Sequence, residues 1–227
     1  MNGRVSSRLI RFAVFDLVGT LIHPQPSVAD VYQRLGRDFG SSLSRDEIQQ
    51  RFGPALAAAD WSDASHLGQR ETWRGIVYGV FELPAREALF EALWDYFAAP
   101  SAWRLYDDAM PAIDALKQRG IFVAIGSNFD DRVENICEAL GLTSAVDRLF
   151  WSSSLKCAKP NQRFFRGIED QVNAQPDELL MVGDSLVNDI QPSRAAGWRA
   201  TQIDRRDLSS AESADIVSDL RDLVGLV

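Results

Sequence analysis

The stretch Phe12-Ala13-Val14-Phe15-Asp16-Leu17-Val18-Gly19-Thr20 decides the fold that we expect for this chain. Its first four residues are all apolar, which is typical of a parallel strand that is buried on both faces of a sheet. The run ends in an acid, Asp16, and the pair Gly19-Thr20 then predicts a turn. Ligands of open α/β sheets bind beyond the carboxyl ends of the strands. Asp16 is therefore the first candidate for a functional side chain.

Further polar groups follow apolar, strand-like runs at 121–125, 149–151 and 179–182. In chain order, these groups are Ser127 with Asn128, Lys159, and Asp184 with Asp189. Helical patterns alternate with the runs, and that alternation predicts an α/β fold in which a parallel sheet is flanked by helices. A carboxylate, a hydroxyl, an ammonium group and a carboxylate pair would then meet at one edge of the sheet. Such groups suit a phosphate and a divalent cation.

Residues 27–100 interrupt this alternation with four amphipathic helical patterns. Ser27 and Ser44 stand where two of these helices would begin, and Glu47 completes a capping box with Ser44. Four such helices can bury their apolar faces against one another as a bundle. Stiff segments with prolines flank the insertion and are its expected hinges.

The composition is that of a globular protein, since 46% of the 227 residues are apolar. The net charge of −8 argues against nucleic acid or an anionic membrane as a partner. No signal-peptide pattern precedes the first strand, and no apolar run approaches the length of a transmembrane helix. We therefore expect a cytoplasmic protein, monomeric or homodimeric. The tryptophans of the insertion are attributed to core packing rather than to a dimer face.

Four sequence blocks resemble the motifs of the haloacid dehalogenase (HAD) superfamily of hydrolases. They are FDLVGT (15–20), IGSN (125–128), the lysine of CAKPNQRFF (157–165) and VGDSLVND (182–189). The resemblance covers nearly the whole chain and implies a Rossmann-like core domain made of residues 1–22 and 101–227. It also implies that residues 23–100 form an inserted, all-α domain of four helices, the C1 cap of this superfamily.

The resemblance gives catalytic and binding roles to five residues. Asp16 would be the nucleophile that forms an aspartyl phosphate, and Lys159 would neutralise the charge on Asp16 and on the phosphoryl group. Thr20, Ser127 and Asn128 would bind the phosphate of a small phosphorylated substrate. Each group also has a simpler interpretation: a solvated lysine, a turn closed by Thr20, and a helix cap at Ser127 and Asn128, where we expect a helix to begin.

The expected cofactor is Mg²⁺, because hard oxygen ligands suit this ion. The resemblance implies a site made of the carboxylates of Asp16, Asp184 and Asp189 and the backbone carbonyl of Val18. The simpler interpretation of Asp184 and Asp189 is that they cap the following helix.

Val18 departs from the pattern of the phosphatases in this superfamily, which reads Asp-x-Asp-Gly-Thr. The second Asp of that pattern protonates the leaving oxygen and then activates water, and valine can do neither. General acid–base catalysis is worth about 10²–10⁴-fold. We therefore expect weakened activity that favours good leaving groups such as acyl or aryl phosphates. His23, just after a small flap expected at Leu21-Ile22, is a candidate for a substitute acid, although an ordinary loop histidine is the simpler interpretation.

Three other functions are alternatives to a phosphatase and can be weighed from the same sequence. Phosphonate hydrolases of the superfamily use a lysine of the cap, but no lysine lies between residues 21 and 116. L-2-haloacid dehalogenases need neither the second Asp nor a metal, but they need a cation on the cap that holds the substrate carboxylate. The candidates for that cation are Arg34, Arg51, Arg70 and Arg74. A protein that binds a phosphorylated ligand without turnover is the third possibility. The prediction is a Mg²⁺-dependent phosphohydrolase acting on a small phosphorylated metabolite.

Overall fold

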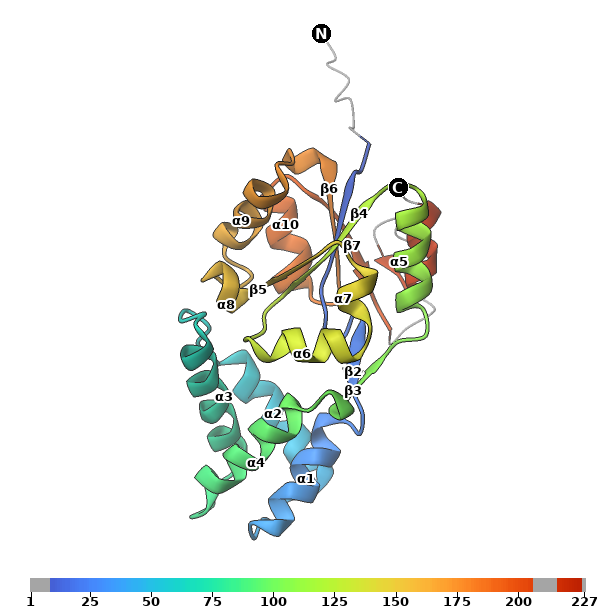
Figure 1. The fold of residues 1–227 in the computed structure, drawn as a ribbon. Helices are drawn as coiled ribbons and strands as arrows, with labels where there is room; N and C mark the ends of the chain where they lie inside the picture. Colours follow the sequence, from blue (N-terminus) through green and yellow to red (C-terminus); the bar gives the residue numbers. More distant parts are fainter. Residues whose placement is uncertain (1–8, 206–215, 226–227) are drawn as a thin grey trace.

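The core of the molecule is a six-stranded parallel sheet, as the alternating pattern predicted (Figure 1). The computed structural model describes residues 9–205 and 216–225. The strands are β1 (Phe12–Phe15), β4 (Phe122–Ser127), β5 (Arg148–Trp151), β6 (Leu179–Gly183), β7 (Arg199–Ile203) and β8 (Ile216–Val217). Their order in the sheet is β5-β4-β1-β6-β7-β8, so β1 lies between β4 and β6. The α/β fold class is therefore confirmed, and the strand that carries Asp16 is central.

Helices cover both faces of this sheet because β1 is apolar on both sides. Ala13 and Phe15 belong to one buried cluster, and Phe12 and Val14 belong to another. The first cluster includes side chains of α5 (Ala109–Gln118), α6 (Arg132–Ala139), α7 (Leu142–Ala145) and the 3₁₀-helix Leu220–Gly225. The second includes side chains of α9 (Gln162–Val172), which is followed in the chain by β6 and α10 (Gln191–Ala195). The short helix α8 (Ser152–Leu155) connects β5 to α9.

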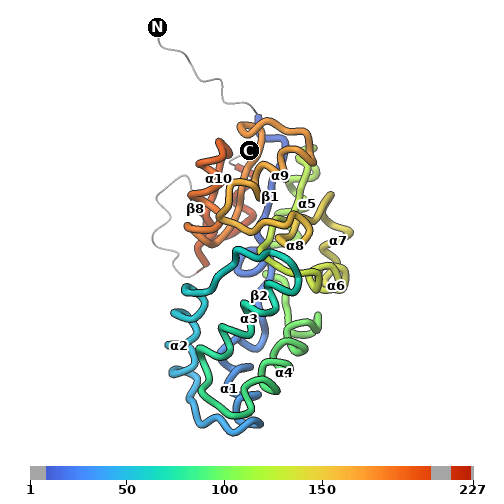
Figure 2. The backbone as a smooth tube through the Cα atoms, turned by 90° about the vertical axis from the view of Figure 1, so that its left-hand side faces the viewer, coloured from blue at the N-terminus to red at the C-terminus, as the bar shows by residue number. Residues whose placement is uncertain are grey.

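The predicted helical insertion lies at the carboxyl ends of the strands, as a second layer (Figures 1 and 2). Its helices are α1 (Val28–Asp38), α2 (Arg45–Ala57), α3 (His66–Val80) and α4 (Arg86–Ala98). They enclose their own apolar cluster, which includes Val31, Ile48, Val80, Phe81 and Leu89. The insertion therefore has a hydrophobic core of its own.

Local sequence signals fix the starts of three of these helices. The Ser27 side chain caps α1, and Ser44 and Glu47 form the predicted capping box at α2. Ser65 caps α3, which begins well before the residues from Trp73 onward that predicted this helix. The extra turns of α3 are polar on most sides, so apolar periodicity does not mark them.

A small antiparallel ribbon joins the insertion to the core. The strand β2 (Ile22–Pro24) pairs with β3 (Trp103–Leu105), and His23 lies opposite Arg104. The chain thus enters and leaves the insertion at one place, where we predict the hinges. In the ranges 9–205 and 216–225, none of the helices is both long enough and apolar enough to cross a membrane.

Candidate active site

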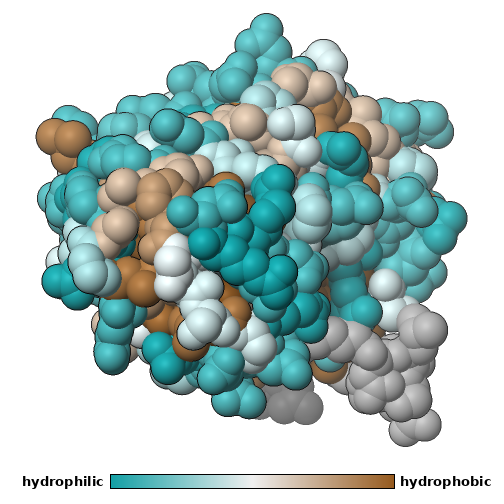
Figure 3. All heavy atoms as spheres, turned by 90° about the horizontal axis from the view of Figure 1, so that it is seen from below, coloured by the Kyte–Doolittle hydropathy of each residue, from teal (hydrophilic) through white to brown (hydrophobic). Residues whose placement is uncertain are grey.

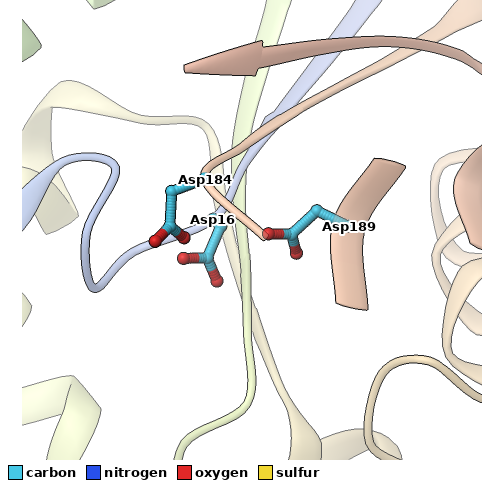
Figure 4. A group of neighbouring side chains, drawn as sticks. All are labelled: Asp16, Asp184 and Asp189. Carbon is cyan, nitrogen blue, oxygen red and sulfur yellow. The ribbon is translucent and has the colours of Figure 1, made fainter. Parts of the chain in front are cut away.

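Three carboxylates meet at the carboxyl ends of the two central strands (Figure 4). Asp16 follows β1, Asp184 follows β6, and Asp189 lies on a short π-helix, Leu186–Ile190. One oxygen of each group lies within 4.8 Å of the others. Asp16 and Asp189 are buried, whereas Asp184 is exposed. The sequence therefore predicted correctly that these acids come together.

The backbone around Asp189 holds its carboxylate in place. The Ser185 N–H donates to Asp189 Oδ2 at 3.0 Å, and the Asp189 N–H donates back to the Ser185 carbonyl at 2.9 Å. Gly183 must be glycine, because a Cβ at that position would lie 2.4 Å from Asp189 Oδ2. Wide π-type turns of this kind often occur at functional sites.

Gly19 has the same relation to Asp184. Its φ is +89°, and a Cβ there would lie 2.6 Å from Asp184 Oδ2. Glycine is thus required both for the left-handed turn and for the close approach of the carboxylate. The sequence suggested a turn at Gly19-Thr20, but the contact with Asp184 depends on packing between distant segments.

Lys159 lies between two of the acids and is buried. Its Nζ is 2.7 Å from Asp16 Oδ1 and 2.6 Å from Asp189 Oδ1. Burial alone would lower the pKa of Lys159, but the two carboxylates outweigh it and hold this pKa above its ordinary value. The ammonium group therefore stays charged, and the interpretation of Lys159 as a solvated surface lysine is wrong.

Burial dominates the electrostatics of Asp16. It raises the pKa of Asp16 to about 7, against the opposing effect of Lys159 and with the support of Asp189 and Asp184. Three carboxylates and one ammonium group leave this site with two negative charges when all are ionised. A charge of this size in a cluster of hard oxygen donors fits a divalent cation such as Mg²⁺.

Asn128 holds the main chain of Lys159. Its Nδ2 donates to the Lys159 carbonyl at 2.8 Å, and its Oδ1 accepts from the Lys159 N–H at 2.8 Å. Sequence reasoning missed this positioning role, because the two residues lie 31 positions apart. The expected helix start at Ser127 was also wrong: α6 begins at Arg132, after a loop. Ser127 and Asn128 both line the cavity beside the acids, and phosphate binding there stays a prediction.

The remaining predicted residues lie close to Asp16 in different surroundings. Val18 lines the same cavity as Asp16. Thr20 is fully buried, and its carbonyl accepts from Arg205 Nη2 at 2.6 Å. His23 packs against the Tyr106 ring at 4.7 Å and is not among the residues that line the cavity. His23 thus belongs to the β2–β3 ribbon and is no loop residue.

A cavity of about 1120 Å³ separates the sheet from the helical insertion. Asp16, Lys159, Asp184 and Asp189 lie on its core side, and apolar side chains of the insertion form the opposite wall. The molecule seen from the insertion side has a mainly hydrophilic surface with separate apolar areas (Figure 3). Much of the apolar surface of the insertion thus faces its own core and this cavity.

Comparison with known proteins identifies similar chains. A mouse protein named haloacid dehalogenase-like hydrolase domain-containing protein 3 is 29% identical, with 84% of this chain and 80% of that protein aligned. The phosphoglycolate phosphatase of Rhodospirillum rubrum is 27% identical over 81% of this chain and 75% of that enzyme. A putative HAD-hydrolase of Bacillus subtilis, solved with bound magnesium, has the same fold with a TM-score of 0.76. That structure is 17% identical and aligns over 96% of this chain and 99% of its own.

The family model of the haloacid dehalogenase-like hydrolases matches residues 10–197, which include every acid of the site and Lys159. The match therefore spans the insertion and the strands β1, β4, β5 and β6 of the sheet. This chain belongs to the haloacid dehalogenase-like hydrolase family and is a hydrolase.

Proposed function

We propose that this protein is a Mg²⁺-dependent phosphohydrolase that acts on a small phosphorylated metabolite through an aspartyl-phosphate intermediate. One observation carries the proposal: Asp16, Asp184 and Asp189 come together at the floor of a large cavity, and the buried ammonium group of Lys159 contacts two of them, Asp16 and Asp189. The likeness to a phosphoglycolate phosphatase supports a phosphorylated substrate. The magnesium in the Bacillus structure supports the choice of metal.

Asp16, Asp184 and Asp189 would hold the ion, together with the backbone carbonyl of Val18. Bound Mg²⁺ would supply positive charge beside two anionic reactants, which otherwise repel each other. Burial works against ionisation of Asp16, whose pKa is about 7 without the ion. Lys159 already lowers this pKa, and a bound cation would lower it further, so both charges favour the ionised nucleophile.

The reaction has two steps at phosphorus. In the first, an Asp16 oxygen forms a bond to phosphorus while the bond to the leaving oxygen breaks, and the leaving group takes the electron pair. In the second, water attacks phosphorus, the bond to Asp16 breaks, and inorganic phosphate leaves. Lys159 Nζ, which contacts Asp16 Oδ1, offsets negative charge in both steps. Ser127 and Asn128 would contact the phosphoryl oxygens, and Asn128 also fixes the lysine.

Val18 limits which leaving groups can depart. Its isopropyl group lines the cavity next to Asp16 and cannot donate a proton. His23 is turned toward Tyr106 and the Pro24 carbonyl rather than toward the cavity. The leaving oxygen therefore departs as an anion or takes its proton from water, which favours acidic leaving groups.

A dehalogenase fits the cavity less well. The cation on the cap that such an enzyme needs is not provided by Arg34, Arg51, Arg70 or Arg74, none of which lines the cavity. Arg70 and Arg74 are instead paired with glutamates of the insertion. Such a reaction would use Asp16 as its nucleophile but needs no metal, so the pair Asp184 and Asp189 would lack the ion that it suits.

We also propose that residues 23–100 act as the cap domain over the core made of 1–22 and 101–227. The ribbon β2–β3 forms both crossings, and the cavity lies between the two layers. Movement about the ribbon would admit substrate and then exclude water from the acids.

The test is hydrolysis of an aryl phosphate and of an alkyl phosphate, with and without Mg²⁺, by wild type, Asp16→Asn and Val18→Asp. The proposal expects slow, Mg²⁺-dependent turnover by wild type, none by Asp16→Asn, and a gain of about 10²–10⁴-fold on alkyl phosphates in Val18→Asp. Tight Mg²⁺-dependent binding without turnover would indicate a binding protein instead. Metal-independent release of halide from 2-haloacids would favour the dehalogenase.

A further inference from the structure

The wall of the cavity opposite the acids carries no charge. Of the residues between 24 and 98, all of which the structure describes, those that line the cavity are apolar, aromatic or small. They include Val28, Phe52, Leu56, Trp61, Trp73 and Trp94. The charged residues of the insertion do not line the cavity, and several of them pair with one another, as Arg70 does with Glu91 and Arg45 with Asp30.

A polar leaving group would be poorly served by this wall. Each hydroxyl or carboxylate that is buried without a partner costs free energy, and the wall offers few partners. An apolar group gains from the same surface in proportion to the area it buries. The volume, about 1120 Å³, is sufficient for a ligand larger than a phosphate ion.

Among the described residues, the positively charged ones that line the core side of the cavity are Arg132, Lys156, Lys159 and Arg163. The contacts of Arg132 are already made. Its Nε and Nη2 each donate to Asp130 at 2.7 Å, and its Nη1 donates to the Trp94 carbonyl at 3.0 Å. The guanidinium also stacks on the Trp94 ring at 3.3 Å from its centre. Arg132 thus joins the two layers and supports the Trp94 ring of the cavity wall rather than recognising a polar group.

We propose that the substrate is a phosphate ester of an aromatic hydroxyl, whose ring system lies against the aromatic wall defined by Phe52, Leu56, Trp61, Trp73 and Trp94. This inference rests on the proposed function and specifies its substrate class. An aromatic hydroxyl meets both conditions that the site sets. Its ring is apolar, which suits the wall, and its oxyanion is stabilised, which suits a site where Val18 supplies no proton.

The first experiment compares phenyl phosphate with 2-naphthyl phosphate, with Mg²⁺ and the full chain. Their leaving groups are of similar acidity, so the extra ring is the main difference. We expect kcat/KM for the naphthyl ester to be about tenfold higher, mostly through KM, because the second ring buries more apolar area. Equal kcat/KM values for the two esters would overturn the proposal.

The second experiment uses matched leucine variants. Leu56 lines the cavity, whereas Leu67 is 73% exposed and does not line it. Leu56→Ser and Trp61→Ala should each lower the preference for naphthyl over acetyl phosphate by several-fold, and Leu67→Ser should leave that preference unchanged. An unchanged preference in both cavity variants would contradict the aromatic wall as the ring site.

Acetyl phosphate separates this proposal from the proposed function, because it has an acidic leaving group but no ring. If acetyl phosphate is hydrolysed and the naphthyl ester is not preferred over the phenyl ester, the phosphohydrolase stands and the ring site is wrong. If none of these compounds is hydrolysed, the proposed function fails, and calorimetric titration with the two aryl esters decides the ring site alone. The ring site is supported if the naphthyl ester binds more tightly than the phenyl ester and if Trp61→Ala weakens that binding. Equal binding of the two esters overturns it.

Discussion

Lys159 forms an ion pair with Asp16 at 2.7 Å and another with Asp189 at 2.6 Å, and within residues 9–205 and 216–225 these two acids form no other ion pair. Replacing Lys159 by methionine removes this positive charge. Methionine keeps much of the volume of the side chain, so the change is mainly one of charge. The Lys159 side chain is 2% exposed, and two carboxylates lose their counter-charge in a buried place. Breaking a buried ion pair typically costs about 3–5 kcal/mol, which is a large part of the roughly 5–15 kcal/mol that stabilises a domain.

The assay is urea unfolding at pH 8 and at pH 5, without Mg²⁺. Lys159 lowers the pKa of Asp16, so loss of the ammonium group raises this pKa further in the folded variant. The folded variant therefore takes up protons as the pH falls, and its free energy of unfolding recovers relative to wild type. We expect a deficit of about 3–5 kcal/mol at pH 8 that is clearly smaller at pH 5 and after Mg²⁺ is added.

Lys117 provides the matched control. Its Nζ is 2.9 Å from Asp147 Oδ1, but the two side chains are 35% and 30% exposed. Lys117→Met should cost at most about 1 kcal/mol, because exposed pairs contribute little. A deficit for Lys159→Met as small as that of Lys117→Met, or one that does not change with pH, would refute the reasoning.

Three further predictions concern the metal and its surroundings. Burial raises the pKa of Asp16 to about 7, so protons should compete with Mg²⁺ for this carboxylate near neutral pH. The affinity for Mg²⁺, measured by calorimetry, should therefore be about tenfold lower at pH 6 than at pH 8, and an affinity that does not change with pH would contradict this. Gly19→Ala should weaken Mg²⁺ binding because its Cβ would collide with Asp184, whereas Gly40→Ala, with φ +90° and open space around the Cβ, should cost stability but leave the affinity unchanged. Asn128→Ala removes two hydrogen bonds of 2.8 Å and should lower the free energy of unfolding by about 1–3 kcal/mol in urea titrations; a loss below that range would mean that the amide is not a positioning group.

Local sequence patterns predicted the strands and helices that are determined by residues close together in the sequence. The apolar run Phe12–Phe15 forms the central strand, and the serine caps at Ser27 and Ser44 begin helices as expected. The alternation of helices and strands predicted a parallel sheet. A parallel sheet in turn predicted that Asp16 and Asp184, which follow two of its strands, lie close together. These inferences need only periodicity and chain order.

The parts that the sequence did not predict depend on contacts between distant segments. The resemblance predicted that Lys159 would neutralise Asp16, but nothing near Lys159 in the sequence indicates that its ammonium group also contacts Asp189, or that Asn128 holds its main chain. The loop between Ser127 and Arg132 was expected to be helical, but its Phe129 carbonyl instead accepts from Gln69 Nε2 of the insertion at 3.2 Å. An uncharged cavity wall is likewise a property of four helices together and not of any one of them.

The ribbon that joins the two layers has a consequence for how such proteins diversify. Ile22 lies opposite Leu105 and Pro24 lies opposite Trp103, so the two ends of the insertion are neighbours in space. The insertion also has its own apolar core, separate from the two clusters on the sheet. A segment with adjacent ends and an independent core can be exchanged for another, or shortened to a turn, without altering the register of the sheet. Evolution can thus replace the wall of the cavity that faces the acids while the acids and the lysine stay unchanged.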